Sequence, residues 1–205
     1  MGDVSVNSRN WVRLFMTTLF LGGSSTIFIG FVLEWDKYNK FFQNFDGKEI
    51  LMVSFWLLGV GLIFSVISQM GFFAYLTVHR FGLGMFRSPA LWNAVQMFLI
   101  AFVLFDFVYF RSVFIANGNE SLGTNIFVAA TLFLFGIIVA YIKSKETNKK
   151  AFVPALFFMI VVTIIEWVPA LRINDTSWLY LMVVPLLICN AYQVLILHRL
   201  VGQES

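Results

Sequence analysis

Charged residues are scarce in this chain: they make up 12% of its 205 residues, whereas hydrophobic residues make up 60%. Soluble globular proteins contain about 25% charged and about 45–50% apolar residues, so this composition excludes an ordinary soluble enzyme. A membrane helix needs roughly 20 apolar residues, and six such helices would use about the observed apolar share. The longest stretch between the apolar runs, residues 34–49, is too short for a soluble catalytic domain.

Cysteine and histidine are also nearly absent, with one Cys and two His. The single Cys189 lies in an apolar run, so one chain can form neither a disulfide nor a cysteine cluster for a metal. His79 and His198 stand beside arginines at expected helix ends, which favours interfacial positions over metal binding. No P-loop, His-Glu-x-x-His or Gly-x-Ser-x-Gly motif occurs. The sequence therefore predicts neither an enzyme nor a bound cofactor or metal.

What the chain does contain is a series of six long apolar runs. They predict an all-α fold, a bundle of six transmembrane helices that forms a single integral membrane domain over residues 1–205. The expected spans are 12–33, 50–76, 91–114, 124–142, 152–170 and 178–197. A β-barrel is excluded because its strands would alternate polar and apolar residues over about ten positions.

The basic residues predict how the bundle is oriented. Nine Lys and Arg fall on the side of the two termini, namely Arg9, Arg13, Arg80, Arg87, Lys143, Lys145, Lys149, Lys150 and Arg199. Five fall on the other side, namely Lys37, Lys40, Lys48, Arg111 and Arg172. The positive-inside rule places both termini in the cytoplasm. The net charge of +3 thus indicates orientation and contact with the lipid bilayer, not a nucleic-acid partner.

Small residues form a stripe along the first expected span. Thr18, Gly22, Thr26 and Gly30 recur every four residues and therefore share one helix face. Such a face lets another backbone approach closely. Two interpretations remain: the stripe packs against helices of the same bundle, or it docks a helix of a partner protein.

Two carboxylates lie inside expected spans, Asp106 in the third and Glu166 in the fifth. An acid within a membrane span is a functional candidate because its burial is costly. Asp106 shares a helix face with Tyr109, and Glu166 shares one with Thr163, so each has a neutral hydrogen-bond partner within reach. With the termini inside, both acids fall toward the outer half. A structural network, ligand or proton sensing, and ion transport are the alternatives.

A second polar group is expected in the inner half of the membrane. It comprises amide side chains on three spans, Gln69, Gln96, Asn190 and Gln193, together with neighbouring serines. Buried amides join helices through hydrogen bonds. Pro185 precedes Asn190 within the sixth span and should kink that helix, either as a static bend or as a hinge.

Several motifs carry a resemblance to a known family. The sequence SRNWVRLF at residues 8–15, with Thr17-Thr18-Leu19 after it and then Trp35 and Tyr38 beyond the first span, resembles the KinB-signalling pathway activation family, KbaA. The segment His79-Arg80-Phe81-Gly82-Leu83-Gly84, the chain length and the six-span layout are similar too. The resemblance covers most of the chain.

The resemblance implies an integral membrane protein of endospore-forming Gram-positive bacteria. It implies a role in sporulation, in which the protein activates the membrane sensor kinase KinB and the phosphorelay. It supplies no catalytic or ligand-binding residues. The residues themselves agree with a helper that binds helices of a KinB-like kinase, and they favour no particular oligomeric state. The alternative is a small transporter or channel that uses Asp106 and Glu166.

Overall fold

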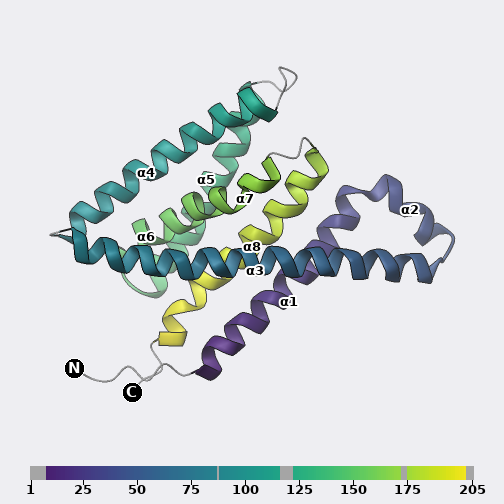
Figure 1. The fold of residues 1–205 in the computed structure, drawn as a ribbon, viewed down its shortest axis with the longest axis horizontal. Coiled ribbons are helices and arrows are strands. Elements are labelled where there is room, and N and C mark those ends of the chain that lie inside the picture. Colours follow the sequence, from purple (N-terminus) through teal and green to yellow (C-terminus); the bar gives the residue numbers. More distant parts are fainter. Residues whose placement is uncertain (1–7, 87, 116–121, 172–174, 202–205) are drawn as a thin grey trace.

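The computed structural model describes residues 8–86, 88–115, 122–171 and 175–201, and all of its regular elements in these ranges are helices (Figure 1). Six helical segments are long and apolar enough to cross a membrane, which confirms the expected all-α bundle. They are Arg9–Leu33, Gly47–Met85, Pro89–Val113, Leu122–Glu146, Lys149–Leu171 and Ser177–Leu200.

Three of the helices pack closely around one another. They are α1 (Ser8–Leu33), α3 (Gly47–Met85) and α8 (Thr176–Val201). Small residues on α1 and α3 allow this close approach. A Cβ atom at Gly61 of α3 would lie only 2.7 Å from the carbonyl oxygen of Gly22 on α1, so the two backbones touch at this crossing.

The other spans stand on the opposite side of α8. They are α4 (Pro89–Phe110), α5 (Leu122–Glu146) and the fifth span, which consists of α6 (Phe152–Phe157), the π-helical η3 (Phe158–Val162) and α7 (Thr163–Leu171). The helix α4 runs along the edge of the bundle and packs on the fifth span and α5, touching α3 only lightly (Figure 1). The π-helical turn η1 (Arg111–Ile115) extends α4.

Local sequence sets where these helices start. Asp46 caps α3, its side chain accepting a hydrogen bond from the backbone N–H of Glu49, and Ser88 caps α4 by accepting one from Leu91 at 3.2 Å. Pro89 follows that cap at the first turn, where its missing N–H costs nothing. The helix α3 continues to Met85 rather than ending near residue 76, and no proline interrupts it.

The interior centres on the fifth and sixth spans. Their largest fully buried side chains include Trp167, Phe158 and Leu186, and Phe72 of α3 packs edge-on against Phe158 at 5.5 Å between ring centroids. The sequence pattern predicted a regular fifth helix. The structure instead begins it with the 3-10 turn η2 (Lys149–Ala151) and interrupts it with η3.

One helix had no counterpart among the expected spans. The short α2 (Trp35–Gln43) connects α1 to α3 in a region where the sequence showed only a polar connection. It folds back onto α1 because Tyr38 and Phe42 pack against Phe31, with ring centroids 5.5 Å and 5.4 Å apart. Only the apolar face of α2 packs against the bundle. A search for long apolar runs therefore does not detect this short amphipathic helix.

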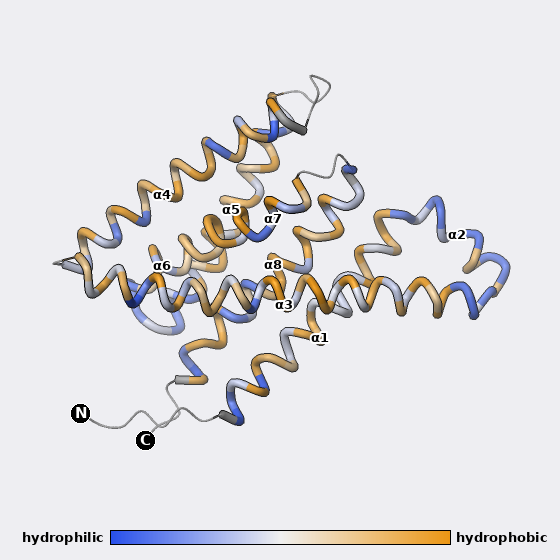
Figure 2. The backbone as a smooth tube through the Cα atoms, in the orientation of Figure 1, coloured by the Kyte–Doolittle hydropathy of each residue, from blue (hydrophilic) through white to orange (hydrophobic). Residues whose placement is uncertain are grey.

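The two ends of the bundle differ in charge. At one end α1 begins and α8 ends (Figure 1). Arg9 and Arg13 lie near the start of α1 and Arg199 near the end of α8, and Arg80 and Lys143 border a pocket there together with His198 of α8. We call this the basic end. The opposite, far end carries α2 with its mixed acids and lysines. Figure 2 shows hydrophilic residues concentrated at α2 and the helix ends, with apolar residues along the spans between them.

Candidate functional site

A cluster of five buried polar side chains lies between α3, the fifth span and α8. We call it the core amide network, and its members are Ser68, Thr163, Glu166, Asn190 and Gln193. The amide of Asn190 donates to Glu166 Oε2 at 2.7 Å and to Thr163 Oγ1 at 2.9 Å. Ser68 donates to Asn190 Oδ1 at 2.6 Å, and Gln193 donates to Ser68 Oγ at 2.5 Å. The bonds therefore tie three spans together.

Helical spacing brings these side chains to one place. Thr163 and Glu166 are three residues apart on α7, and Asn190 and Gln193 are three apart on α8, so each pair shares a helix face. On α3, Gly71 makes room for the carboxylate, because a Cβ atom there would overlap Glu166 Oε1. Glycine is therefore required for α3 to approach α7 this closely.

The sequence had assigned Glu166 to an outer group and Asn190 to a separate inner group, and this division is wrong because the two side chains hydrogen bond directly. Side chains on a helix lean toward its N-terminus. The α7 helix runs toward the far end, so Glu166 leans back toward mid-depth. The α8 helix runs the other way, so Asn190 leans toward that same depth.

The second intramembrane acid is not part of this network. Asp106 is exposed on α4, and Tyr109 on the same helix is 57% exposed. Within the described part of the chain, no hydrogen bond or ion pair involves the Asp106 carboxylate. The nearby Arg111 turns inward instead, where its Nε donates to Asn125 Oδ1 at 2.7 Å. The structure thus separates two acids that the sequence had grouped.

Two further glutamines predicted for the inner group, Gln69 and Gln96, are buried on α3 and α4. Among the described residues, no hydrogen bond joins either of them to the core amide network. Sequence analysis overlooked two other buried polar side chains, Asn125 and Lys143. Asn125 stands directly before the apolar run that begins at Ile126, so its burial was not evident from the sequence. The Lys143 side chain folds under α8 to reach Leu195 O at 3.3 Å, which no sequence pattern indicates.

The small-residue stripe of α1 lies inside the bundle. Thr18 and Thr26 are fully buried, and their hydroxyls donate to carbonyls of their own helix at 2.8 Å and 2.7 Å. A Cβ atom at Gly22 would overlap Ser65 Oγ, and one at Gly30 would approach Leu57 Cδ2 to 2.6 Å. In this structure the stripe contacts α3 and α8 of the same chain.

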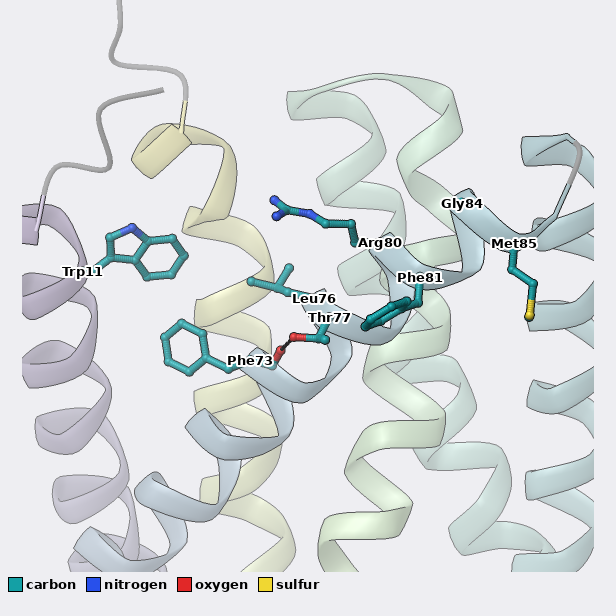
Figure 3. Close-up of a pocket in the computed structure, with 8 residues that line it drawn as sticks. All are labelled: Trp11, Phe73, Leu76, Thr77, Arg80, Phe81, Gly84 and Met85. Carbon is teal, nitrogen blue, oxygen red and sulfur yellow. Dashed lines mark hydrogen bonds between the residues drawn. The ribbon is translucent and has the colours of Figure 1, made fainter. Parts of the chain in front are cut away.

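At the basic end, α1 and α3 border an apolar groove of about 660 Å³. Figure 3 shows Trp11 of α1 next to Phe73 of α3 in its lining, with ring centroids 5.4 Å apart, and Arg80 farther along α3. Its remaining lining is mostly apolar. The groove therefore suits hydrocarbon chains or apolar side chains better than a polar metabolite.

At the far end, a smaller cavity of about 180 Å³ lies between α1, α2, α3 and the start of α8. Lys37 borders it and lies 3.5 Å from the Glu34 carboxylate. The neighbouring Tyr38 and Glu34 raise the pKa of Lys37 above its ordinary value, so this lysine remains a cation. Within the described ranges, no group of three or more His, Cys, Asp or Glu side chains forms a metal site.

Comparison with known proteins identifies a family and a relative that this chain resembles in sequence. A family model described as KinB-signalling pathway activation in sporulation (KbaA) matches residues 22–200. The KinB-signaling pathway activation protein of Bacillus subtilis (strain 168) is 50% identical over 194 residues, which cover 95% of this chain and 98% of that protein. No solved structure matches this chain.

Proposed function

Because the chain belongs to the KinB-signalling pathway activation family (KbaA), we propose that it is a multi-pass cell-membrane protein that activates a KinB-like sensor kinase. In this role it feeds the sporulation phosphorelay. The observation that carries the proposal is the 50% identity to the Bacillus subtilis protein over nearly the full length of both chains. Six helices that are long and apolar enough to cross a membrane support this membrane location.

The mechanism we propose is contact between helices within the membrane. A kinase that exists in inactive and active states is shifted toward the state that the activator binds better. A difference in binding of about 1.4 kcal/mol between the two states changes their ratio about tenfold. Helix packing and a few interhelical hydrogen bonds supply energies of this size. No catalytic residue of the activator is needed for such a shift.

The orientation we propose has both termini in the cytoplasm, where the phosphorelay operates. Lys and Arg at the basic end support it, since short loops rich in these residues stay inside. His198 and Arg199 near the end of α8 approach Glu146 of α5 at 4.0 Å and 3.8 Å, so the helix ends on this side are joined by charged side chains. The basic end then faces the soluble part of the kinase.

A transporter or channel based on the two intramembrane acids is less well supported. Asp106 is exposed on the face of α4 that points away from the bundle, whereas Glu166 is buried and hydrogen bonded to Asn190 between α7 and α8. Proton or ion transfer between them would need a chain of polar groups across the fifth span. The buried face of α4 opposite that span is largely apolar, with Ile100 and Phe107 among its members.

Reconstitution tests the proposal. The full-length chain and the KinB kinase are placed in proteoliposomes, alone and together, and the rate of kinase autophosphorylation is measured. We expect the rate to rise with the amount of activator and to stay constant with an unrelated six-span protein. Uptake of protons or potassium by vesicles that hold the activator alone, with no effect on the kinase, would contradict the proposal and favour transport.

A further inference from the structure

The exposed acid on α4 lies where lipid would otherwise surround it. Asp106 is seven residues before the end of the span Pro89–Val113, about 10 Å along the helix axis. The residues around it are apolar, and Phe105 is 70% exposed. Acids within membrane spans ordinarily face a protein interior or a polar cavity, because a carboxylate in hydrocarbon is costly. Within the described part of the chain, Asp106 does neither.

The same face of α4 has the repeat of a coiled-coil seam. Positions spaced alternately by four and three residues carry large apolar side chains, namely Leu91, Val95, Phe98, Phe102, Phe105 and Tyr109. All but Val95 are at least half exposed. The buried face of α4, which includes Trp92, Gln96 and Ile100, points to the opposite side. Apolar residues at this spacing let a second helix pack along the first.

Asp106 stands at the flank of that seam, directly after Phe105. In coiled coils the flanking positions hold the charged side chains that choose the partner. The carboxylate would therefore bind best to a cation or a strong hydrogen-bond donor on the facing helix. A second copy of this chain does not supply one, because in a parallel pair of α4 helices the position opposite Asp106 is Ala101.

We propose that the exposed seam of α4 is the surface that binds a transmembrane helix of the kinase, and that this helix carries an Arg, Lys or His opposite Asp106. The inference rests on the proposed function and specifies its surface. Charge complementarity sets the depth and the rotation of the partner helix, while the aromatic side chains supply the contact area. The peripheral position of α4 leaves room for that helix (Figure 1).

Photocrosslinking with matched positions tests this surface. The photoreactive analogue p-benzoyl-L-phenylalanine replaces Phe98 or Phe105 on α4, and in controls Phe28 on α1 or Phe55 on α3. The four phenylalanines are 69–72% exposed, so only the helix differs. The full-length protein is produced together with the KinB kinase, and activation is read from a phosphorelay reporter. We expect kinase adducts from both α4 positions and not from the controls.

Substitutions of Asp106 test the charge. Asp106→Leu should lower the yield of the kinase adduct about three- to twentyfold at unchanged protein abundance, which corresponds to the loss of one interhelical hydrogen bond. Asp106→Arg should lower it further. Asp106→Asn keeps an oxygen acceptor but loses the charge, so its yield should lie between those of Asp106→Leu and the unaltered protein. If the Leu variant is degraded, two results still test the proposed surface. They are the positions of the adducts in the otherwise unaltered protein and the comparison of Asp106→Asn with Asp106→Arg.

The failures are distinguishable. Kinase adducts from Phe28 or Phe55 alone would overturn the α4 surface and leave the proposed function intact. Adducts between two copies of this chain at Phe98 would show that a second copy occupies the seam. Adduct yields and activation that are unchanged in both Asp106→Leu and Asp106→Arg would show that the carboxylate contributes nothing to partner binding. Lipid adducts at all four positions, together with full activation, would overturn both the surface and activation by helix contact.

Discussion

Replacing Gly22 by alanine should separate α1 from α3 at their closest crossing. The added methyl group would overlap Ser65 Oγ and lie 3.1 Å from both Cys189 Sγ and Gly61 O. Ser65 Oγ donates to Thr18 O of α1 at 3.2 Å and to Gly61 O of its own helix at 3.0 Å. The methyl group forces the serine away, so the substitution adds volume and breaks the bond between the helices.

The two effects can be given magnitudes. Overpacking a close-packed site costs about 1–3 kcal/mol, and an interhelical hydrogen bond in a membrane contributes about 0.6 kcal/mol. Their sum lowers the free energy of unfolding by about 1.6–3.6 kcal/mol, which corresponds to a fall in Tm of about 3–14 °C for a chain of this length. Gly59→Ala is the matched control on α3. A Cβ atom there meets nothing within 4 Å, so alanine should leave Tm unchanged or raise it slightly.

The chain carries its own reporter for this measurement. Cys189 is its single cysteine and is fully buried, so a thiol-reactive fluorogenic dye labels it only as the protein unfolds. Heating in detergent with this dye gives Tm for each variant. Adding Ser65→Ala to Gly22→Ala removes the overlapping oxygen and should restore at least half of the loss. An unchanged Tm for Gly22→Ala, or no recovery in the double variant, would refute this description of the crossing.

Other substitutions follow from the same contacts. Asn190→Leu removes three hydrogen bonds of the core amide network and should lower the free energy of unfolding by about 2 kcal/mol, whereas Glu166→Gln keeps an oxygen acceptor and should cost less than about 1 kcal/mol in the dye assay. Loss of kinase activation by Glu166→Gln at normal Tm would instead indicate a required ionisable group. In Gly82→Ala the added methyl group would overlap the indole of Trp92 on α4, so Tm should fall. In Gly84→Ala the methyl group meets nothing within 4 Å, so Tm should stay unchanged. A reporter fused after Lys150 should read cytoplasmic, and an external reading would contradict the orientation.

The number and type of the membrane-spanning helices could be predicted from sequence because one physical constraint decides both. A bilayer of fixed thickness requires long apolar runs, and its lack of water requires every backbone N–H and C=O to be bonded within a helix. The elements that escaped prediction are those that depend on packing. The helix α2 forms because Phe31 of α1 receives its aromatic side chains, and the turn η3 interrupts a run whose apolar sequence looks uniform.

The candidate site could be predicted only residue by residue. Glu166 and Asn190 were identifiable separately, since each is a polar residue inside an apolar run. Their contact depends on which helices are neighbours and on the direction in which each side chain leans. A linear sequence without relatives carries neither. Asp106 illustrates the same limit, because a carboxylate on a span looks identical in sequence whether its helix face turns inward or outward.

The contrast between the two acids bears on how an activator of this architecture can act without unfolding. Glu166 is held in a network that joins α3, α7 and α8, so changes there disturb three spans at once. Asp106 belongs to a helix held on one face only. A partner helix that binds this face replaces lipid without breaking any of the network's bonds. In the contact that we propose, the free energy of binding can therefore shift the kinase between its states without rearranging this chain.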